Sequence, residues 1–353
     1  MTDPPVPRVT LMDVAQRAGV SRTTASFVTT GRLDMRISAD AQKRVLRAAR
    51  ELGYRPSLLA RSLRTNRSQT IGLLSDQIAV GAFAGEMIRG SLTSALLHEH
   101  LLFVAETAGS AAVEKRMIDN MLDRGVGGFL YACMYTKRVR ISSALRAQPL
   151  VLVNCTTRAR TAPTVIPNES EAGRAVARIL LRYGHSDRIV LVGETPPDVV
   201  AAAERLAGIQ HVLAEQGLEL AGTIATRWWP RPAHDAVSDF LGEGHRPSAF
   251  ICLNDRIAMG VYQACQEAGL EVPEVISVVS FDDSDLAGWL RPQLTSAAIP
   301  HFEMGRRAVE ILLAEDRPAR VHLVPMALRE RASIAAPAPR RRARRPRVAT
   351  GST

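Results

Sequence analysis

Three side chains near the amino terminus have the chemistry needed to contact the bases and phosphates of a nucleic acid. Arg22, Thr23 and Ser26 have the spacing expected for the outward side of one short helix. A guanidinium can donate two hydrogen bonds to N7 and O6 of guanine, so Arg22 is expected to contact a guanine. Thr23 can bond a base edge or touch a thymine methyl group. The hydroxyls of Thr10, Ser21 and Ser26 are expected to bind phosphates.

The residues around them predict two helices joined by a tight turn. Thr10 and Asp13 have the spacing of a capping box that starts a first helix, and Gly19 can adopt the left-handed backbone that ends it. Ser21 is a typical N-cap for a second helix, which would present Arg22 to solvent. This pattern indicates a helix-turn-helix, whose second helix enters the major groove of DNA. The alternative is an ordinary helical bundle with solvated arginines.

A third helix and a short linker extend this pattern. Residues 38–52 have helical apolar spacing, and Gly53 follows as a stop. With these elements, residues 9–64 resemble the headpiece of the lactose-repressor (LacI/GalR) family of bacterial transcription regulators, and the resemblance continues to about Ile334. Family members often carry Ser-Arg-Val where this chain has Ser26-Phe27-Val28. Phe27 cannot make a bidentate base contact, so we expect it to pack inward or to touch a thymine methyl group.

Residues 57–64 are long enough for about two turns of helix. So short a helix is marginal alone in water and needs a partner. The resemblance implies that this segment pairs with that of a second copy, enters the minor groove and inserts a leucine between base pairs, and Leu63 matches that leucine. Ala60 is small enough for close pairing, and Arg61 and Arg64 can contact phosphates or the groove floor. The alternative is a plain tether with a solvated basic face.

The positive charge is concentrated at the two ends of the chain. The net charge is +10 over 353 residues; residues 1–69 contain 13 Arg or Lys against 5 Asp or Glu, and residues 335–353 contain 6 Arg and no acidic residue. The middle of the chain is therefore net acidic, and contact with polyanions is expected at the ends. The Pro- and Arg-rich tail, residues 335–353, is predicted to be disordered.

Other features of the composition indicate a cytoplasmic protein. The sequence has no apolar run long enough to cross a membrane, and its proline-rich start lacks a signal-peptide core. The cysteines have no metal-type spacing and are expected to be reduced: Cys133, Cys155, Cys252 and Cys265. We expect no bound metal and no cofactor.

From residue 70 onward, short apolar runs alternate with helical patterns. The predicted strands are residues 71–74, 101–104, 126–130, 150–153, 189–192, 249–252 and 276–281. Alternating strands and helices indicate parallel sheets covered on both faces. The resemblance implies a periplasmic-binding-protein-like core of two parallel-sheet lobes. It also implies crossovers near residues 166 and 298, and a further one near the C-terminus.

Polar side chains follow several predicted strands, at the edge where parallel sheets bind ligands. These candidates are Asp76, Asn154, Asn254 and Asp282. The resemblance implies that Arg205, which opens the segment Arg-Leu-Ala-Gly, binds an effector together with Asn254 and Asp282. Trp228 or Trp229 can stack on the face of a sugar. The alternative is that Asn254 and Asp282 only cap the helices that follow them.

These features predict a ligand-responsive, sequence-specific DNA-binding transcription regulator, a repressor of sugar or other carbon-source genes. It would bind a palindromic operator as a homodimer, with a tetramer as an open alternative. Its parts would be a headpiece (residues 1–56), a hinge helix and linker (57–69), a two-lobe core (70–334) and a basic tail (335–353). The expected effector is a sugar or polyol. A purine remains an alternative, because the same Arg and Asp positions could bind it. Ile299 stands where family members commonly carry glutamine, so the resemblance does not identify the effector.

Two other classes of protein compete with this interpretation. An extracytoplasmic solute-binding protein would share the core, but it would have a signal peptide and no headpiece. An enzyme would need a nucleophile–base pair, a metal motif or a nucleotide fingerprint, and the sequence shows none of these patterns. We therefore expect a binding protein without catalytic residues.

Overall fold

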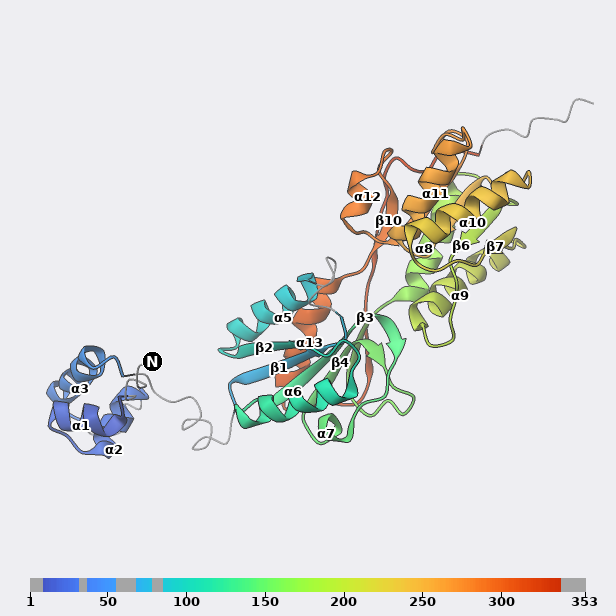
Figure 1. Ribbon diagram of the computed structural model, residues 1–353. Helices are drawn as coiled ribbons and strands as arrows, with labels where there is room; N and C mark the ends of the chain where they lie inside the picture. Colours follow the sequence, from blue (N-terminus) through green and yellow to red (C-terminus); the bar gives the residue numbers. More distant parts are fainter. Residues whose placement is uncertain (1–8, 32–36, 55–67, 78–84, 338–353) are drawn as a thin grey trace, which may run out of the picture. The chain divides into compact units, whose positions relative to one another are not determined.

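The computed structural model describes residues 9–31, 37–54, 68–77 and 85–337. Within these ranges the chain forms a helical headpiece and an α/β core with two lobes (Figure 1), which confirms the predicted fold class. The hinge residues Ala60, Arg61, Leu63 and Arg64 lie outside the described residues, as does the arginine-rich part of the tail.

The headpiece contains three helices around a small apolar core. They are α1 (Leu11–Ala18), α2 (Arg22–Thr29) and α3 (Ala39–Glu51). The buried side chains of this core are Val14, Ala15, Ala18, Ala25, Val28, Val45 and Ala48. The predicted capping box starts α1: the Thr10 hydroxyl accepts from the Asp13 N–H, and the Asp13 carboxylate accepts from the Thr10 N–H at 2.7 Å. Gly19, with φ of 63°, ends α1.

Each lobe of the core is built on a six-stranded sheet. The amino-terminal lobe has the strand order β11-β5-β4-β3-β1-β2, and the carboxy-terminal lobe has the order β12-β10-β9-β8-β6-β7. The strands of the first sheet are β1 (Thr70–Ser75), β2 (Leu101–Glu106), β3 (Gly128–Arg138), β4 (Leu150–Thr156), β5 (Thr164–Pro167) and β11 (Val321–Val324). Those of the second are β6 (Ile189–Val192), β7 (Gly222–Ile224), β8 (Ala249–Cys252), β9 (Ser277–Asp282), β10 (Thr295–Ala298) and β12 (Ala327–Arg329).

The strand pairing agrees with the predicted parallel sheets. It is parallel from β1 through β3, β4 and β5 to β11, and from β7 through β6, β8 and β9 to β10. At one edge of the second sheet, β12 runs antiparallel to its neighbour β10. Parallel strands place their carboxyl ends at one edge of each sheet, so the residues that follow them can converge on one site.

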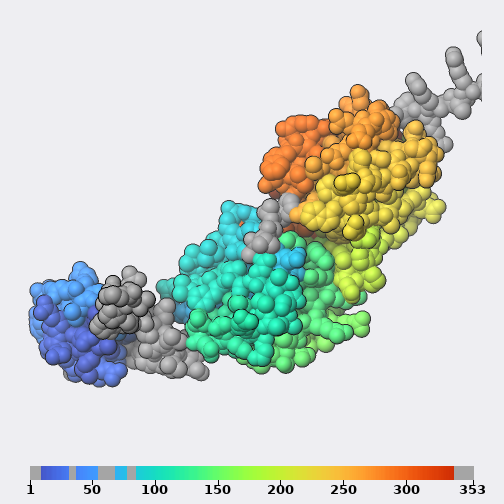
Figure 2. All heavy atoms as spheres, viewed as in Figure 1, coloured from blue at the N-terminus to red at the C-terminus, as the bar shows by residue number. Residues whose placement is uncertain are grey.

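Helices cover both sheets. The amino-terminal lobe carries α5 (Gly85–Leu97), α6 (Ala111–Asp123), α7 (Ser143–Arg146) and α13 (His301–Leu313). The carboxy-terminal lobe carries α8 (Glu169–Arg182), α9 (Val200–Glu215), α10 (Pro230–Gly242), α11 (Asp255–Glu267) and α12 (Asp285–Trp289). In Figure 2 the first lobe is mainly cyan and green, and the second is mainly yellow and orange. The chain changes lobe after β5, after β10 and after β11, which confirms the three predicted crossovers.

The described chain continues past the predicted end of the core. The carbonyl oxygen of Ala335 accepts a hydrogen bond from Nε2 of buried His185 at 2.9 Å, and its N–H donates to the Ser277 hydroxyl at 3.0 Å. The prediction of disorder from residue 335 is therefore wrong for residues 335–337. The physical reason is that His185 and Ser277 provide buried polar partners, which the composition of the tail does not reveal.

Candidate functional site

The second headpiece helix presents the predicted base-contacting side chains. Arg22 and Thr23 are exposed on α2, whereas Ser26 and Phe27 are half-buried. The first turn of α2 contains no acidic residue. Free N–H groups at a helix start and an adjacent arginine both favour an anionic partner. The half-buried position of Phe27 is compatible with both contacts expected for it.

Two of the three hydroxyls expected at phosphates also cap helices. Thr10 caps α1, and Ser21 caps α2 by accepting from the Thr24 N–H at 3.0 Å. Ser21 is exposed and its hydroxyl also lies 2.9 Å from that of Thr24. These caps fix the helix ends where a phosphate would bind, so the cap and the phosphate roles can coexist.

The core contains a cavity of about 910 Å³ lined by residues of both lobes. Five of the six side chains predicted to bind an effector line it: Asn154, Arg205, Trp228, Asn254 and Asp282. They come from different elements, namely β4, α9, the segment before α10, the start of α11 and the end of β9. The residues on β4 and β9 therefore converge with those on α9 and α11, as expected for the carboxyl ends of parallel strands.

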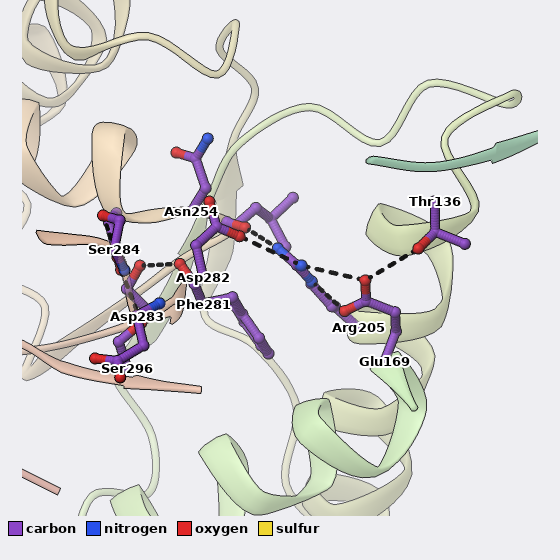
Figure 3. A network of polar contacts seen from close by, with 12 residues as sticks. Thr136, Glu169, Arg205, Asn254, Phe281, Asp282, Asp283, Ser284 and Ser296 are labelled. Atoms are coloured by element: carbon purple, nitrogen blue, oxygen red, sulfur yellow. Dashed lines mark hydrogen bonds and ion pairs between the residues drawn. The ribbon is translucent and has the colours of Figure 1, made fainter. Parts of the chain in front are cut away.

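Arg205 is the most buried charged group of this cavity. Its Nε and one terminal nitrogen donate to the two carboxylate oxygens of Glu169 at 2.7 and 3.2 Å. A terminal nitrogen lies 3.5 Å from an Asp282 oxygen, and Figure 3 shows Arg205 between the two acids. Burial alone would lower the pKa of Arg205, but the Glu169 and Asp282 carboxylates raise it. The guanidinium is therefore held charged in the site.

Glu169 is a functional candidate that sequence reasoning missed. It is only 3% exposed and also lies 3.4 Å from the Thr136 hydroxyl. Glu169 follows the short strand β5, so it obeys the same strand-end rule as the predicted residues. The rule could have found it, but β5 has four residues and ends in proline, and the sequence did not predict a strand there.

Glycines bring Arg205 and Glu169 together. A Cβ atom on Gly208 of α9 would lie 2.0 Å from the Ser170 carbonyl oxygen, and one on Gly173 of α8 would lie 2.2 Å from the Arg205 carbonyl oxygen. These two helices can approach so closely only without side chains at both positions. The glycine of the predicted Arg-Leu-Ala-Gly segment thus places α9 against the helix that carries Glu169.

Asp282 is the second carboxylate at the guanidinium. Burial raises its pKa to about 8, although Arg205 partly offsets this shift. Its backbone has φ of 105°, a value that L residues rarely adopt. The helix that follows, α12, is preceded by Ser284 as its N-cap, so the alternative that Asp282 caps a helix is wrong. Its carboxyl group is directed to the cavity and to Arg205 instead (Figure 3).

Asn254 does have a capping role. Its side-chain oxygen accepts from the Ile257 N–H at 2.8 Å, at the start of α11. This confirms the capping alternative for Asn254, but it uses only the oxygen. The amide nitrogen forms no hydrogen bond with the described residues, so it can still donate to a ligand in the cavity.

The structure corrects the expectation for Asp76. This residue does not line the cavity. Its carboxylate accepts from the Met134 N–H at 3.1 Å and forms an ion pair with Lys137 at 2.5 Å. Both partners lie on β3, near the register shift between β3 and β4. Asp76 therefore holds the end of β3, and the sequence could not reveal this because Lys137 is distant in the chain.

Asn154 lines the cavity, but its amide is already engaged. Its oxygen accepts from the Thr136 hydroxyl at 2.7 Å, and its nitrogen donates to the Cys133 carbonyl at 3.0 Å. Its φ of 55° is left-handed. These bonds position Thr136, whose hydroxyl also approaches Glu169, so Asn154 acts first as a support of the cavity wall.

Two tryptophans provide the aromatic surface of the cavity. Trp228 donates from its indole nitrogen to the Glu194 carbonyl at 2.9 Å, which fixes the ring, and the Arg205 guanidinium lies 5.8 Å from that ring. Trp229 is exposed, with the guanidinium of Arg256 at 4.5 Å from its ring. Charged and aromatic groups side by side can bind a polar ligand that has one flat, less polar face.

Metal clusters and membrane spans are both absent from the described residues. Among the residues that the structure describes, no cluster of three or more His, Cys, Asp or Glu side chains could hold a metal ion. None of the helices in the described part of the chain combines the length and the apolar character needed to cross a membrane.

Comparison with known proteins relates both parts of the chain to bacterial regulators. Residues 10–57 match the model for bacterial regulatory proteins of the lacI family, and residues 177–334 match that for a periplasmic binding protein-like domain. The chain is 31% identical to the HTH-type transcriptional regulator AscG of Escherichia coli (strain K12), over 84% of this chain and 88% of that protein. It is 32% identical to the HTH-type transcriptional repressor PurR of Vibrio atlanticus, over 86% and 91% respectively.

A solved structure extends the similarity to the arrangement of the chain. The lac repressor dimer, bound to its operator and the anti-inducer ONPF, matches with a TM-score of 0.78 and 25% identity. The match covers 94% of this chain and 100% of that one. It therefore includes both the headpiece and the two-lobe core.

Proposed function

The chain belongs to the lacI family of bacterial regulatory proteins, and we propose that it represses transcription by binding a palindromic operator as a dimer. Its binding to DNA would respond to a small molecule in the core cavity. The proposal depends on one observation: the same chain contains a capped helix that exposes Arg22 and a cavity that is built around Arg205. The first supplies DNA recognition, and the second supplies a means of regulation.

DNA recognition is proposed to involve α2 directly. Arg22 donates to a guanine edge, Thr23 contacts a neighbouring base, and Ser26 and Phe27 contact the groove or backbone. Thr10 and Ser21 hold the helix ends at phosphates. The hinge residues Ala60, Arg61, Leu63 and Arg64 stay a prediction from the sequence, in which Leu63 enters the minor groove.

A second copy of the chain is proposed to cover an apolar surface on the amino-terminal lobe. Large apolar side chains are exposed on α5 and the adjacent edge strand β2: Leu92, Leu96, Leu97, Leu101 and Val104. Several exposed large apolar side chains on neighbouring elements favour a protein interface here. A dimer would place two headpieces at two half-sites, so a palindromic operator mirrors its symmetry.

The effector is proposed to be a small polar molecule, a sugar or polyol, bound by Arg205, Asn254, Asp282 and Trp228. A buried guanidinium with two carboxylates can bind hydroxyls through charge-assisted hydrogen bonds, and Trp228 provides a flat face. A purine is the second candidate. We further infer that the cavity binds this molecule without converting it, and that the protein acts in the cytoplasm, where its operator is.

Selection of DNA fragments by the full-length protein, followed by footprinting, tests the DNA-binding part. The expected result is one inverted repeat, protected symmetrically. A single asymmetric half-site would contradict the dimer, and the absence of any preferred sequence would contradict the function as a whole.

Calorimetry with D-ribose, cellobiose and hypoxanthine tests the cavity. The expected result is binding of a sugar by the wild type, with strong losses in Arg205→Ala and Asp282→Ala, because truncation leaves polar groups buried and unpaired. Equal binding by the wild type and both variants would overturn the site assignment. A product that appears during incubation with any of these compounds would overturn the inference that the protein is not an enzyme.

A further inference from the structure

A buried nitrogen in the cavity has no hydrogen-bond partner. His301 lines the cavity, and its Nδ1 is shielded from solvent without any partner among the described residues. Buried polar atoms are almost always paired, since an unpaired one forfeits its hydrogen bonds to water. A polar group absent from the free chain is therefore expected at this position.

The position of His301 is fixed by the helix that it begins. His301 is the first residue of α13, directly after the crossover from β10. A Cβ atom on Gly305 of α13 would lie 2.1 Å from the Met87 carbonyl oxygen, and one on Gly90 of α5 would lie 2.0 Å from the Phe302 carbonyl oxygen. Because α13 packs this closely on α5, it cannot rotate to give the imidazole another partner without losing that contact.

The charge state of His301 limits which ligand group can pair with it. Burial, with the nearby Arg205 guanidinium, lowers the pKa of His301 to about 4. The imidazole is therefore neutral near pH 7, with one nitrogen as a donor and the other as an acceptor. A hydroxyl can donate or accept, so it pairs with either tautomer. A carboxylate or phosphate can only accept, so it pairs only with the tautomer that carries the proton on Nδ1, and a purine N–H can only donate, so it pairs only with the other tautomer.

We propose that His301 is a specificity-determining residue of the effector site and that its Nδ1 binds a hydroxyl group of a neutral sugar or polyol. This inference rests on the proposed function of the cavity and deepens it, because it names a hydroxyl-bearing ligand as the partner of Nδ1. It also places one ligand contact on α13, a helix of the amino-terminal lobe, whereas Arg205, Asn254 and Asp282 belong to the other lobe. A ligand that contacts residues of both lobes favours the one arrangement of the lobes in which all these contacts form.

Calorimetry on the full-length protein tests this assignment with D-ribose, cellobiose and hypoxanthine as probes. We expect the wild type to bind a sugar, and His301→Phe to bind it about tenfold more weakly because a hydrogen bond is lost. His301→Asn should recover much of the affinity, since the asparagine amide can reach the region of Nδ1. The matched control is His211→Phe at a half-exposed position of α9, which should leave affinity unchanged. Thermal unfolding of each variant separates lost binding from lost folding.

Monodeoxy analogues of the sugar that binds identify the hydroxyl. One analogue should lose about as much affinity for the wild type as His301→Phe loses for the parent sugar, and should lose nothing further in that variant. Equal losses for every analogue in both proteins would mean that His301 acts only through its shape, which would overturn the inference. Binding of hypoxanthine alone by the wild type would overturn it too. If the wild type binds none of the three probes, the proposed cavity function itself fails.

Discussion

One buried guanidinium and two carboxylates set the charge of the cavity. Arg205 has a bidentate partner in Glu169 and a more distant one in Asp282 at 3.5 Å. Because Glu169 already matches the charge of Arg205, Asp282 receives too little compensation for its own burial, and its pKa rises to about 8. Near pH 7 and without a ligand, Asp282 is therefore mostly protonated, and an effector that bonds its ionised form must displace that proton.

The stability of the core is expected to fall as the pH rises toward 8. An unfolded aspartate ionises near 3.8, whereas folded Asp282 has a pKa of about 8, so the folded chain binds more protons between these values. A rising pH then favours unfolding, by at most about 1.4 kcal/mol per pH unit from this group. His301 has its pKa lowered from 6.5 to about 4, so it makes the stability rise with pH, but only below pH 6.5, the pKa of an unfolded histidine.

Urea unfolding of the wild type and Asp282→Asn measures this dependence between pH 6.5 and 8, the window that these pKa values define. The free energy of unfolding of the wild type should decrease relative to that of the variant across this range. The charged groups that act on Asp282 there are Arg205, Asp255, Glu169 and Arg256. Parallel curves for the two proteins would show that Asp282 ionises in the folded state as it does in water.

Replacement of Arg22 by alanine is expected to relax specificity at one base pair in each half-site. An arginine bidentate to guanine contributes about 1–3 kcal/mol of discrimination, so affinity should fall for the preferred operator and much less for one mutated at that pair. Fluorescence anisotropy on both operators measures the difference. Arg47→Ala, at an exposed position of α3, is the control, and it should change the affinity for the two operators by the same factor. A loss of equal size on every sequence would reassign Arg22 to a phosphate.

At the scale of elements, pairs of glycines decide how helices place functional side chains. Gly173 and Gly208 allow α8 and α9 to meet backbone to backbone, which brings Glu169 to Arg205. Gly90 and Gly305 do the same for α5 and α13, and α13 carries His301 into the cavity. Both contacts use backbone atoms, so a side chain cannot adapt to relieve an added methyl group.

Gly208→Ala is expected to destabilise the core and to weaken effector binding together. The new Cβ would lie 2.0 Å from the Ser170 carbonyl oxygen, so α9 must move away and carry Arg205 with it. The loss of stability should be about 1–3 kcal/mol or more, as for other overpacked sites. Gly242→Ala, at the end of α10 with no atom within 4 Å of its Cβ, is the matched control.

Chemical unfolding of both variants gives the stability change, and calorimetry at a temperature where both are folded gives the binding change. Gly242→Ala should be neutral or slightly stabilising, because alanine favours a helix over glycine. A Gly208→Ala protein that kept wild-type stability and affinity would show that the close contact of α8 and α9 does not position Arg205.

At the scale of the assembly, the exposed apolar side chains of α5 and β2 are the surface that we propose a second copy covers. Leu97 is 79% exposed and Leu96 is 59% exposed at the end of α5, and Leu101 and Val104 continue the surface on β2. This is the edge of the amino-terminal sheet opposite β11. Helix α5 carries part of the surface assigned to a second copy. It also packs on α13, the helix that begins with His301.

Leu97→Lys is expected to shift the protein from dimer to monomer. A lysine there puts a charge into the proposed interface on each copy, where burying it without a partner is costly. Sedimentation analysis should show the shift, and operator affinity should then depend strongly on protein concentration. The control is Leu323→Lys, at a position that is 53% exposed on the opposite edge strand β11, and it should leave both properties unchanged. A Leu97→Lys protein that remains a dimer would move the interface elsewhere.

The helices of the headpiece and the alternation of strands and helices in the core could be predicted from the sequence because their signals are local, whereas the crossovers followed only from the family resemblance. The capping box at Thr10, the left-handed stop at Gly19 and the N-cap at Ser21 each depend on residues within one helical turn, and all three are present. Apolar runs of strand length located most of the sheet strands for the same reason.

Which polar side chains serve the cavity depends on contacts between residues that are distant in the sequence. Asp76, Glu169 and His301 all lie near strand ends or crossovers, and local sequence does not separate them. Long-range contacts do: Lys137 engages Asp76, close helix packing brings Glu169 to Arg205, and the crossover leaves His301 with a buried unpaired nitrogen. The reason is physical, since burial and pairing depend on neighbours that are distant in the chain, and these two properties set the charge and hydrogen-bonding capacity of each group.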